Sequence, residues 1–176
     1  RDERINRIFE GTNEVNHLLI PGMILRKAMK GELPLQKEAM KALEGLMTPS
    51  FEEIDDSQPF AHEKVLLKNL KAVFLLLAGA AVQKYLMRLQ DEQEILTAAA
   101  DIAIEIFALE SAVLRAEKTL PKASDKRREL VSAAVTVCAF RASEAVGTAA
   151  RRGAFYVEEG DNCLLYTSDA ADEEDS

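Results

Sequence analysis

Three long stretches in the second part of the chain repeat apolar residues at helical spacing, and this feature constrains the fold most. They run from about Phe60 to Leu89, from about Glu92 to Leu120, and from about Lys126 to Glu158. Residues three or four positions apart share one face of a helix, so each stretch predicts a helix with one apolar stripe. The stripe residues are Leu67, Leu70, Phe74, Leu77, Ala81, Tyr85 and Leu89; Ile95, Ile102, Ile106, Leu109, Val113 and Leu120; and Leu130, Ala134, Val137, Ala145 and Ala149.

The connections between these stretches are short, which favours antiparallel neighbours. Pro121 ends the second stretch, and Ser124 or Asp125 can cap the third helix. Good helix formers dominate the composition, and we find neither an alternating strand pattern nor a glycine-rich phosphate loop. The sequence therefore predicts an all-α fold, a helical bundle of three long helices.

Two shorter helices are predicted ahead of the bundle. Residues Glu14–Lys30 carry a rough apolar stripe, and Pro21 followed by Gly22 predicts a kink or break within it. A short helix is predicted over Leu35–Met47. The acidic segment Phe51–Pro59 then predicts a loop before the bundle begins.

The segment RIFEGTNEV, Arg7–Val15, has the residues of a turn that leads into a helix. Gly11 is free to take a positive φ, and Thr12 or Asn13 can cap the helix that follows. Backbone N–H groups at such a helix start suit an anion or a phosphate-bearing cofactor. Glu10 projects from this turn beside apolar residues, and partial desolvation would make it a better base. A solvated carboxylate at a helix junction is the alternative interpretation.

The charge and the cysteine pattern exclude some classes of function. The formal net charge is −8, from 22 basic and 30 acidic residues, so we expect no nucleic-acid partner. Cys138 and Cys163 form neither a disulfide framework nor a metal-ligand spacing, and we predict no metal site. His17 and His62 stand alone, and the sequence assigns neither a role.

The last fourteen residues resemble the translation of a sequencing adapter. CLLYTSDAAD, Cys163–Asp172, is what the codons TGT CTC TTA TAC ACA TCT GAC GCT GCC GAC encode, which resemble a transposase-type sequencing adapter read in frame. Residues 163–176 hold five acids and no base, so the chain without them has 25 acids, 22 bases and a net charge of −3. We expect 163–176 to be a disordered library artefact; a genuine acidic tail is the alternative.

A membrane role has little support in the sequence. The charged opening RDERINRIFE lacks the apolar core of a secretory signal, so we expect no such leader. The apolar run Val73–Val82 is about half of the roughly 20 residues that a spanning helix needs, and we predict a buried core helix there. Peripheral contact with anionic lipid would fall to the basic residues Lys126, Arg127, Arg128, Arg151 and Arg152.

The opening residues also resemble a known family. The chain begins RDERINRIFEGTNEV, which combines an Arg-Asp pair, an Arg-Ile pair, an aromatic residue, Glu-Gly-Thr and a polar pair: Arg1, Asp2, Arg7, Ile8, Phe9, Glu10, Gly11, Thr12, Asn13 and Glu14. This order resembles the catalytic-base segment of the acyl-CoA dehydrogenases. The following LLIPGMILRKAMKGELPL, Leu18–Leu35, resembles the bacterial long- and very-long-chain type, which carries an additional C-terminal helical domain.

The resemblance implies specific roles for these residues. Glu10 would remove the α-proton of a fatty acyl-CoA, while the β-hydrogen leaves as hydride to FAD. Gly11 would lie against the acyl-CoA substrate, and the FAD contacts would come from Thr12, Asn13 and Glu14. Arg1 and Asp2 would be scaffold residues.

The resemblance further implies that the chain is a fragment of a larger flavoenzyme, inactive alone. Residues 1–33 would end the dehydrogenase C-terminal helical domain, and 34–162 would form the additional helical domain. An electron-transferring flavoprotein is the implied partner, the parent would be a homo-oligomer, and the implied location is the bacterial cytoplasm. A non-catalytic all-α interaction or scaffold domain is the alternative.

Overall fold

The computed structural model describes residues 2–48 and 54–158, and the secondary structure within these ranges is entirely helical. The elements in chain order are η1 (Asp2–Arg7), α1 (Asn13–Met29), α2 (Leu35–Met47), α3 (Ala61–Tyr85), η2 (Leu86–Asp91), α4 (Gln93–Thr119), η3 (Leu120–Lys122) and α5 (Asp125–Val157). The all-α prediction is confirmed. The helix predicted up to Leu89 ends at Tyr85, and the 3₁₀ segment η2 follows it. Arg1, part of the predicted loop and the segment 163–176 lie outside the described residues.

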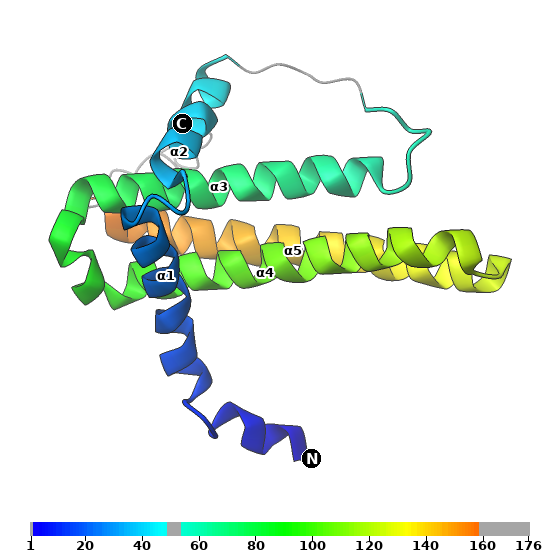
Figure 1. Cartoon of the computed structure of the whole chain (residues 1–176), viewed down its shortest axis with the longest axis horizontal. Coiled ribbons are helices and arrows are strands. Elements are labelled where there is room, and N and C mark those ends of the chain that lie inside the picture. Colours follow the sequence, from blue (N-terminus) through cyan, green and yellow to red (C-terminus); the bar gives the residue numbers. More distant parts are fainter. Residues whose placement is uncertain (1, 49–53, 159–176) are drawn as a thin grey trace, which may run out of the picture.

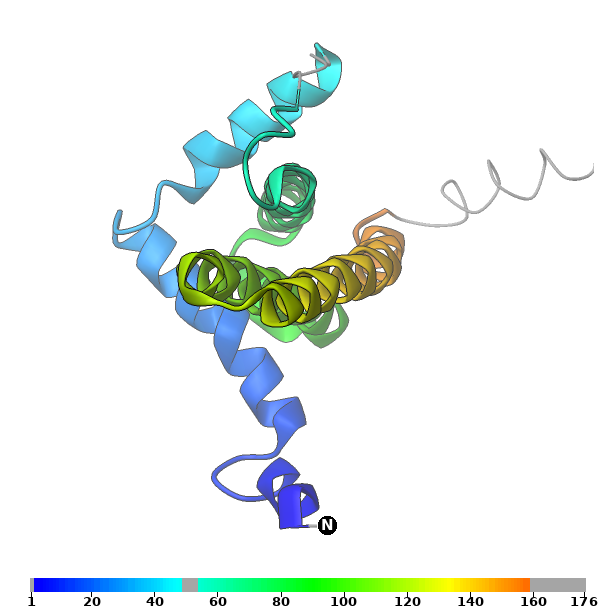
Figure 2. The same cartoon turned by 90° about the vertical axis from the view of Figure 1, so that its right-hand side faces the viewer.

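The three long helices α3, α4 and α5 lie side by side and alternate in direction, as the short connections predict (Figure 1). Helix α1 crosses this bundle at a steep angle and contacts α4, while α2 packs on α3 (Figure 2). The structure is therefore an antiparallel three-helix bundle with two shorter helices laid against it. The segment before α1 extends away from the bundle (Figure 1).

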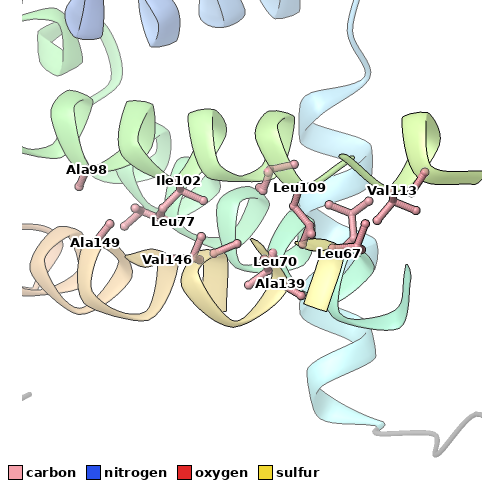
Figure 3. Packing of buried hydrophobic residues seen from close by; sticks show 14 residues of the cluster. Leu67, Leu70, Leu77, Ala98, Ile102, Leu109, Val113, Ala139, Val146 and Ala149 are labelled. Atoms are coloured by element: carbon pink, nitrogen blue, oxygen red, sulfur yellow. The ribbon is translucent and has the colours of Figure 1, made fainter. Parts of the chain in front are cut away.

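The core fills the space between α3, α4 and α5 (Figure 3). Ala98 and Ile102 of α4 are completely buried within it. Burying a large aliphatic side chain contributes about 1.5–3 kcal/mol to folding, so this shared core holds the three helices together. The cluster comprises Leu67, Leu70 and Leu77 of α3; Ala98, Ile102, Ile106, Leu109, Val113 and Ala116 of α4; and Val135, Ala139, Ala142, Val146 and Ala149 of α5.

The predicted stripe of α5 is wrong over its first half. Leu130, Ala134 and Val137 are exposed, whereas the buried residues are Val135, Ala139, Ala142, Val146, Ala149 and Gly153. These buried residues are mostly small, and small side chains allow two helices to approach closely. The predicted stripe also contained small residues, but in this half of α5 it lies one position before the buried Val135, because contact with α3 and α4 fixes the buried face.

Helix α1 is continuous through Pro21, so of the predicted kink or break, the break is absent. Proline lacks the N–H that would bond the carbonyl of His17, so it weakens the helix interior. Pro21 is nevertheless buried, and it lines a small apolar cavity with Leu25, Leu77 and Ile95. Packing against the bundle therefore stabilises the helix where the local sequence weakens it.

The C-terminal end of α5 is held by side chains from α3. Tyr85 donates its hydroxyl proton to the carbonyl of Tyr156 at 2.7 Å, and the ammonium of Lys84 donates to the carbonyl of Val157. The last carbonyls of a helix have no partner within the helix. These two bonds satisfy two of them and tie the ends of α3 and α5 together.

The apolar run Val73–Val82 lies within α3, where Leu77 and Ala81 are buried in the bundle. By length and composition alone, α3 and α5 could each cross a membrane. Core helices of bundles pass the same test, and both helices supply core residues here.

Candidate active site

The candidate site is the turn between η1 and α1. The short helix η1 ends with bonds from the N–H groups of Ile8 and Phe9 to the carbonyl of Ile5, at 3.0 and 3.2 Å. The chain then reverses through Glu10 and Gly11, whose φ angles are +59° and +91°. Two consecutive residues with positive φ make a sharp turn. The second is glycine, because a side chain is unfavourable at positive φ.

Glu10 occupies a backbone conformation that non-glycine residues seldom adopt. Only three non-glycine residues in the described ranges have positive φ: Glu10, Phe60 and Leu86. This conformation costs about 1–2 kcal/mol for a residue with a side chain. Such backbone strain is concentrated at functional sites, where the surrounding structure holds it in place.

The start of α1 fixes the other side of the turn. Thr12 is the N-cap, as predicted, and its hydroxyl oxygen accepts from the N–H of Val15 at 3.3 Å. The side-chain amide of Asn16 donates to the carbonyl of Gly11 at 3.1 Å. A side chain on Gly11 would bring its Cβ to 3.1 Å from Asn16 Oδ1. Glycine therefore leaves the space in which the amide of Asn16 closes the turn.

Glu14 lies in the first turn of α1, where its carboxylate faces hydrogen-bond donors. The bond to its own backbone N–H and that to the Thr12 hydroxyl lower its pKa below 4.5, helped by the nearby charges of His17 and Arg7. A carboxylate at a helix N-terminus is also stabilised by the helix dipole. Glu14 is thus held as an anion and suits hydrogen-bond acceptance.

Glu10 itself is exposed, and the apolar residues before it do not cover it. The exposed fractions are 67% for Ile8 and 57% for Phe9. The desolvated carboxylate considered from the sequence is therefore absent in this chain. Chemically, the turn presents an accessible proton acceptor directly before a capped helix N-terminus.

The turn brings the five predicted site residues, Glu10 to Glu14, together in one short segment. Residues 2–48 and 54–158 contain no group of three or more His, Cys, Asp or Glu side chains arranged to hold a metal ion.

A second polar feature was missed by the sequence analysis. Nε2 of His17 on α1 lies 3.2 Å from Oδ1 of Asp101 on α4, and Arg152 of α5 donates to Oδ2 of the same carboxylate. These residues lie at one end of a groove of about 540 Å³ formed mainly by α4 and α5. The three residues are far apart in the sequence, so spacing could not have revealed the cluster.

Comparison with known proteins assigns the family. The profile of the acyl-CoA dehydrogenase C-terminal domain matches residues 69–169, more than half of the chain. The chain belongs to the acyl-CoA dehydrogenase family. The match extends into 163–176, so the origin of that segment stays a prediction.

Two relatives in this family cover nearly the whole chain. A probable acyl-CoA dehydrogenase from Bacillus subtilis (strain 168) is 40% identical over 168 residues, which span 96% of this chain. The crystal structure of an acyl-CoA dehydrogenase complexed with FAD from Bacillus anthracis is 44% identical and covers 95% of the chain with a TM-score of 0.85. In both cases the chain spans only 28% of the relative's length.

Proposed function

We propose that this chain is the C-terminal part of an FAD-dependent acyl-CoA dehydrogenase, with Glu10 as the base. The observation that carries the proposal is the strained turn of Glu10 directly before the capped start of α1. In a member of this family, a carboxylate so presented suits removal of the α-proton from a fatty acyl-CoA thioester. The substrate class we propose is long-chain acyl-CoA, on the strength of the resemblance of Leu18–Leu35.

Each residue of the turn has a different proposed role. The carboxylate of Glu10 takes the α-proton, which the neighbouring thioester carbonyl makes acidic, and Gly11 allows the substrate to approach the backbone. Bound FAD would supply the acceptor for the β-hydride. The FAD contacts we propose are Thr12, Asn13 and Glu14, whose polar groups stand at a helix N-terminus that suits an electron-rich cofactor.

The exposed apolar face of α1 supports a larger parent protein. Val15, Leu19 and Met23 follow one another at helical spacing, and their exposed fractions are 52%, 49% and 53%. A helix normally buries such a stripe. In the parent enzyme, further domains would cover this face, desolvate Glu10 and supply the flavin and acyl pockets.

The proposal extends to the setting of the parent enzyme. Residues 1–33 end its dehydrogenase C-terminal domain, and 34–162 form an additional helical domain. The parent is a bacterial cytoplasmic homo-oligomer that passes electrons to an electron-transferring flavoprotein. A non-catalytic scaffold has less support, because both relatives are described as acyl-CoA dehydrogenases.

The test is Glu10→Gln in the complete parent enzyme, with stopped-flow bleaching of the oxidised flavin by a long-chain acyl-CoA. The amide keeps shape and polarity but cannot accept the proton, so flavin reduction should slow by at least about 10² to 10⁴. FAD and acyl-CoA binding should persist. Glu44→Gln, at an exposed position on α2, is the matched control and should reduce flavin at the parent rate. A Glu10→Gln enzyme as fast as the parent would refute the assignment.

A further inference from the structure

Both ring nitrogens of His17 face an oxygen atom of a neighbouring group. Nδ1 lies 2.6 Å from the carbonyl oxygen of Asn13, and Nε2 lies 3.2 Å from Oδ1 of Asp101. Both partners are acceptors in this arrangement, because a carbonyl and a carboxylate have no proton to donate. The imidazole therefore lies between the backbone of α1 and a carboxylate of α4.

Asp101 connects His17 to the rest of the bundle. Its second oxygen accepts a bond from the guanidinium of Arg152 on α5. The carboxylate of Asp101 on α4 therefore lies between the imidazole of His17 on α1 and the guanidinium of Arg152 on α5. Bonds between charged partners are stronger than neutral ones, which gives this link a defined geometry even at partial exposure.

His17 also contacts the backbone of the turn that carries Glu10. The carbonyl that His17 holds belongs to Asn13, the first residue of α1. The preceding residues are tied to the same helical turn through bonds from Val15 to Thr12 and from Asn16 to Gly11. The backbone from Gly11 to His17 is thus one hydrogen-bonded unit, and Glu10 is the residue directly before it.

Apolar contacts hold α1 from Leu18 onward. Leu18 and Leu25 pack against the cluster of Ala81, Leu89, Ile95 and Leu96. The apolar side chains of Ile8 and Phe9, ahead of the turn, are exposed and do not hold it against the bundle. Orientation of the first turn of α1 therefore depends on the polar contact of His17, while docking of the helix as a whole does not.

We propose that His17 is a positioning residue, which fixes the Glu10 turn on the helical bundle through Asp101. The inference rests on the proposed role of Glu10 as base. His17 lies one helical turn beyond the cap and does not act on substrate. It sets the direction from which the carboxylate approaches the α-carbon, and so affects the rate of proton removal more than substrate affinity.

The first test uses the complete parent enzyme with bound FAD. In His17→Ala and in Asp101→Asn, flavin reduction at saturating long-chain acyl-CoA should slow by about 10- to 100-fold, the cost of a misplacement of about 1 Å. FAD content and the acyl-CoA dissociation constant should not change. His62→Ala is the matched control, since His62 pairs with Asp56 at 2.8 Å, away from the turn, and it should reduce flavin at the parent rate.

A second readout does not depend on activity. In the 176-residue chain, the amides of Val15 and Asn16 should exchange with deuterium about 10-fold faster in His17→Ala, because a charged hydrogen bond worth about 1.5 kcal/mol is lost. His62→Ala should leave their exchange unchanged.

Three outcomes overturn the inference. One is unchanged flavin reduction in His17→Ala when Glu10→Gln is inactive, which removes the positioning role alone. Another is a loss of activity that arises only from weaker acyl-CoA binding. The third is unchanged amide exchange at Val15 and Asn16. Flavin reduction at the parent rate in Glu10→Gln would instead refute the role of Glu10 as base. In that case, amide exchange in His17→Ala still decides whether the contact of His17 with Asp101 orders the turn.

Discussion

Gly153 of α5 packs directly against Leu77 of α3, so closely that a Cβ on Gly153 would lie 2.7 Å from Cδ2 of Leu77. The same Cβ would lie 3.3 Å from Cβ of Ala98 on α4. Glycine thus allows three helices to meet near the crossing of α1. Ala98 is completely buried, and Leu77 is buried beside the small apolar cavity at Pro21, so neither side chain has much room to move.

Gly153→Ala should destabilise the chain by about 1–3 kcal/mol, the usual cost of overpacking a core. Gly147→Ala is the matched control in the same helix, because its Cβ would meet only Arg151 Nη1 at 3.7 Å. There the better helix propensity of alanine should stabilise the chain by up to about 1 kcal/mol. Urea denaturation followed by circular dichroism measures both. Equal stabilities for the two variants would show that the close approach has no energetic effect.

The carboxyl group of Glu14 should titrate below its usual range, because its own N–H and the Thr12 hydroxyl bond the charged form. A lowered folded-state pKa contributes stability that is present above the unfolded-state pKa, near 4.5, and is lost as pH falls through the folded-state value. Thr12→Ala should move the pKa of Glu14 back toward 4.5 in carbon-detected NMR titrations. Thr48→Ala, at the far end of α2, should not. An unchanged Glu14 titration in Thr12→Ala would contradict the assigned cause.

The strained conformation of Glu10 predicts a difference between two substitutions. Glycine adopts a φ of +59° without penalty, whereas alanine keeps the strain. Glu10→Gly should therefore be more stable than Glu10→Ala by about 1 kcal/mol, reversing their usual order. Amide exchange of the turn and urea denaturation test this in the 176-residue chain. Greater stability for the alanine variant would show that the turn relaxes without cost.

The sequence predicted the bounds of the helices better than it predicted which face of each helix is buried. Periodicity and proline positions located the helix over Leu35–Met47 at its observed bounds, because Pro34 precedes it and Pro49 follows it in the sequence. The face of α5 was misassigned over its first half, since the predicted stripe included the exposed Ala134 and the adjacent Val135 is the buried residue. Helix faces depend on the partner surface, which local patterns do not contain.

At the candidate site, too, local features were predicted and contacts between helices were not. The Thr12 cap follows from a local pattern, and the structure contains it. The partnership of His17 with Asp101 joins different helices and appears only after folding. The strain at Glu10 was also not predicted, because the sequence pointed to Gly11 as the residue with positive φ.

Helix α1 acts mechanically as a lever between the bundle and the turn. Its 17 residues span about 25 Å at about 1.5 Å per residue, and Pro21 and Leu25 seat its middle and far part on the bundle. A tilt of about 5° about that seat would carry the near end by about 1–2 Å over such a length. The spacing of α3, α4 and α5 would thereby set the reach of the proposed base, although the bundle core lies away from the reacting carbon. Sequence drift within that core could then tune turnover without altering any group that touches substrate.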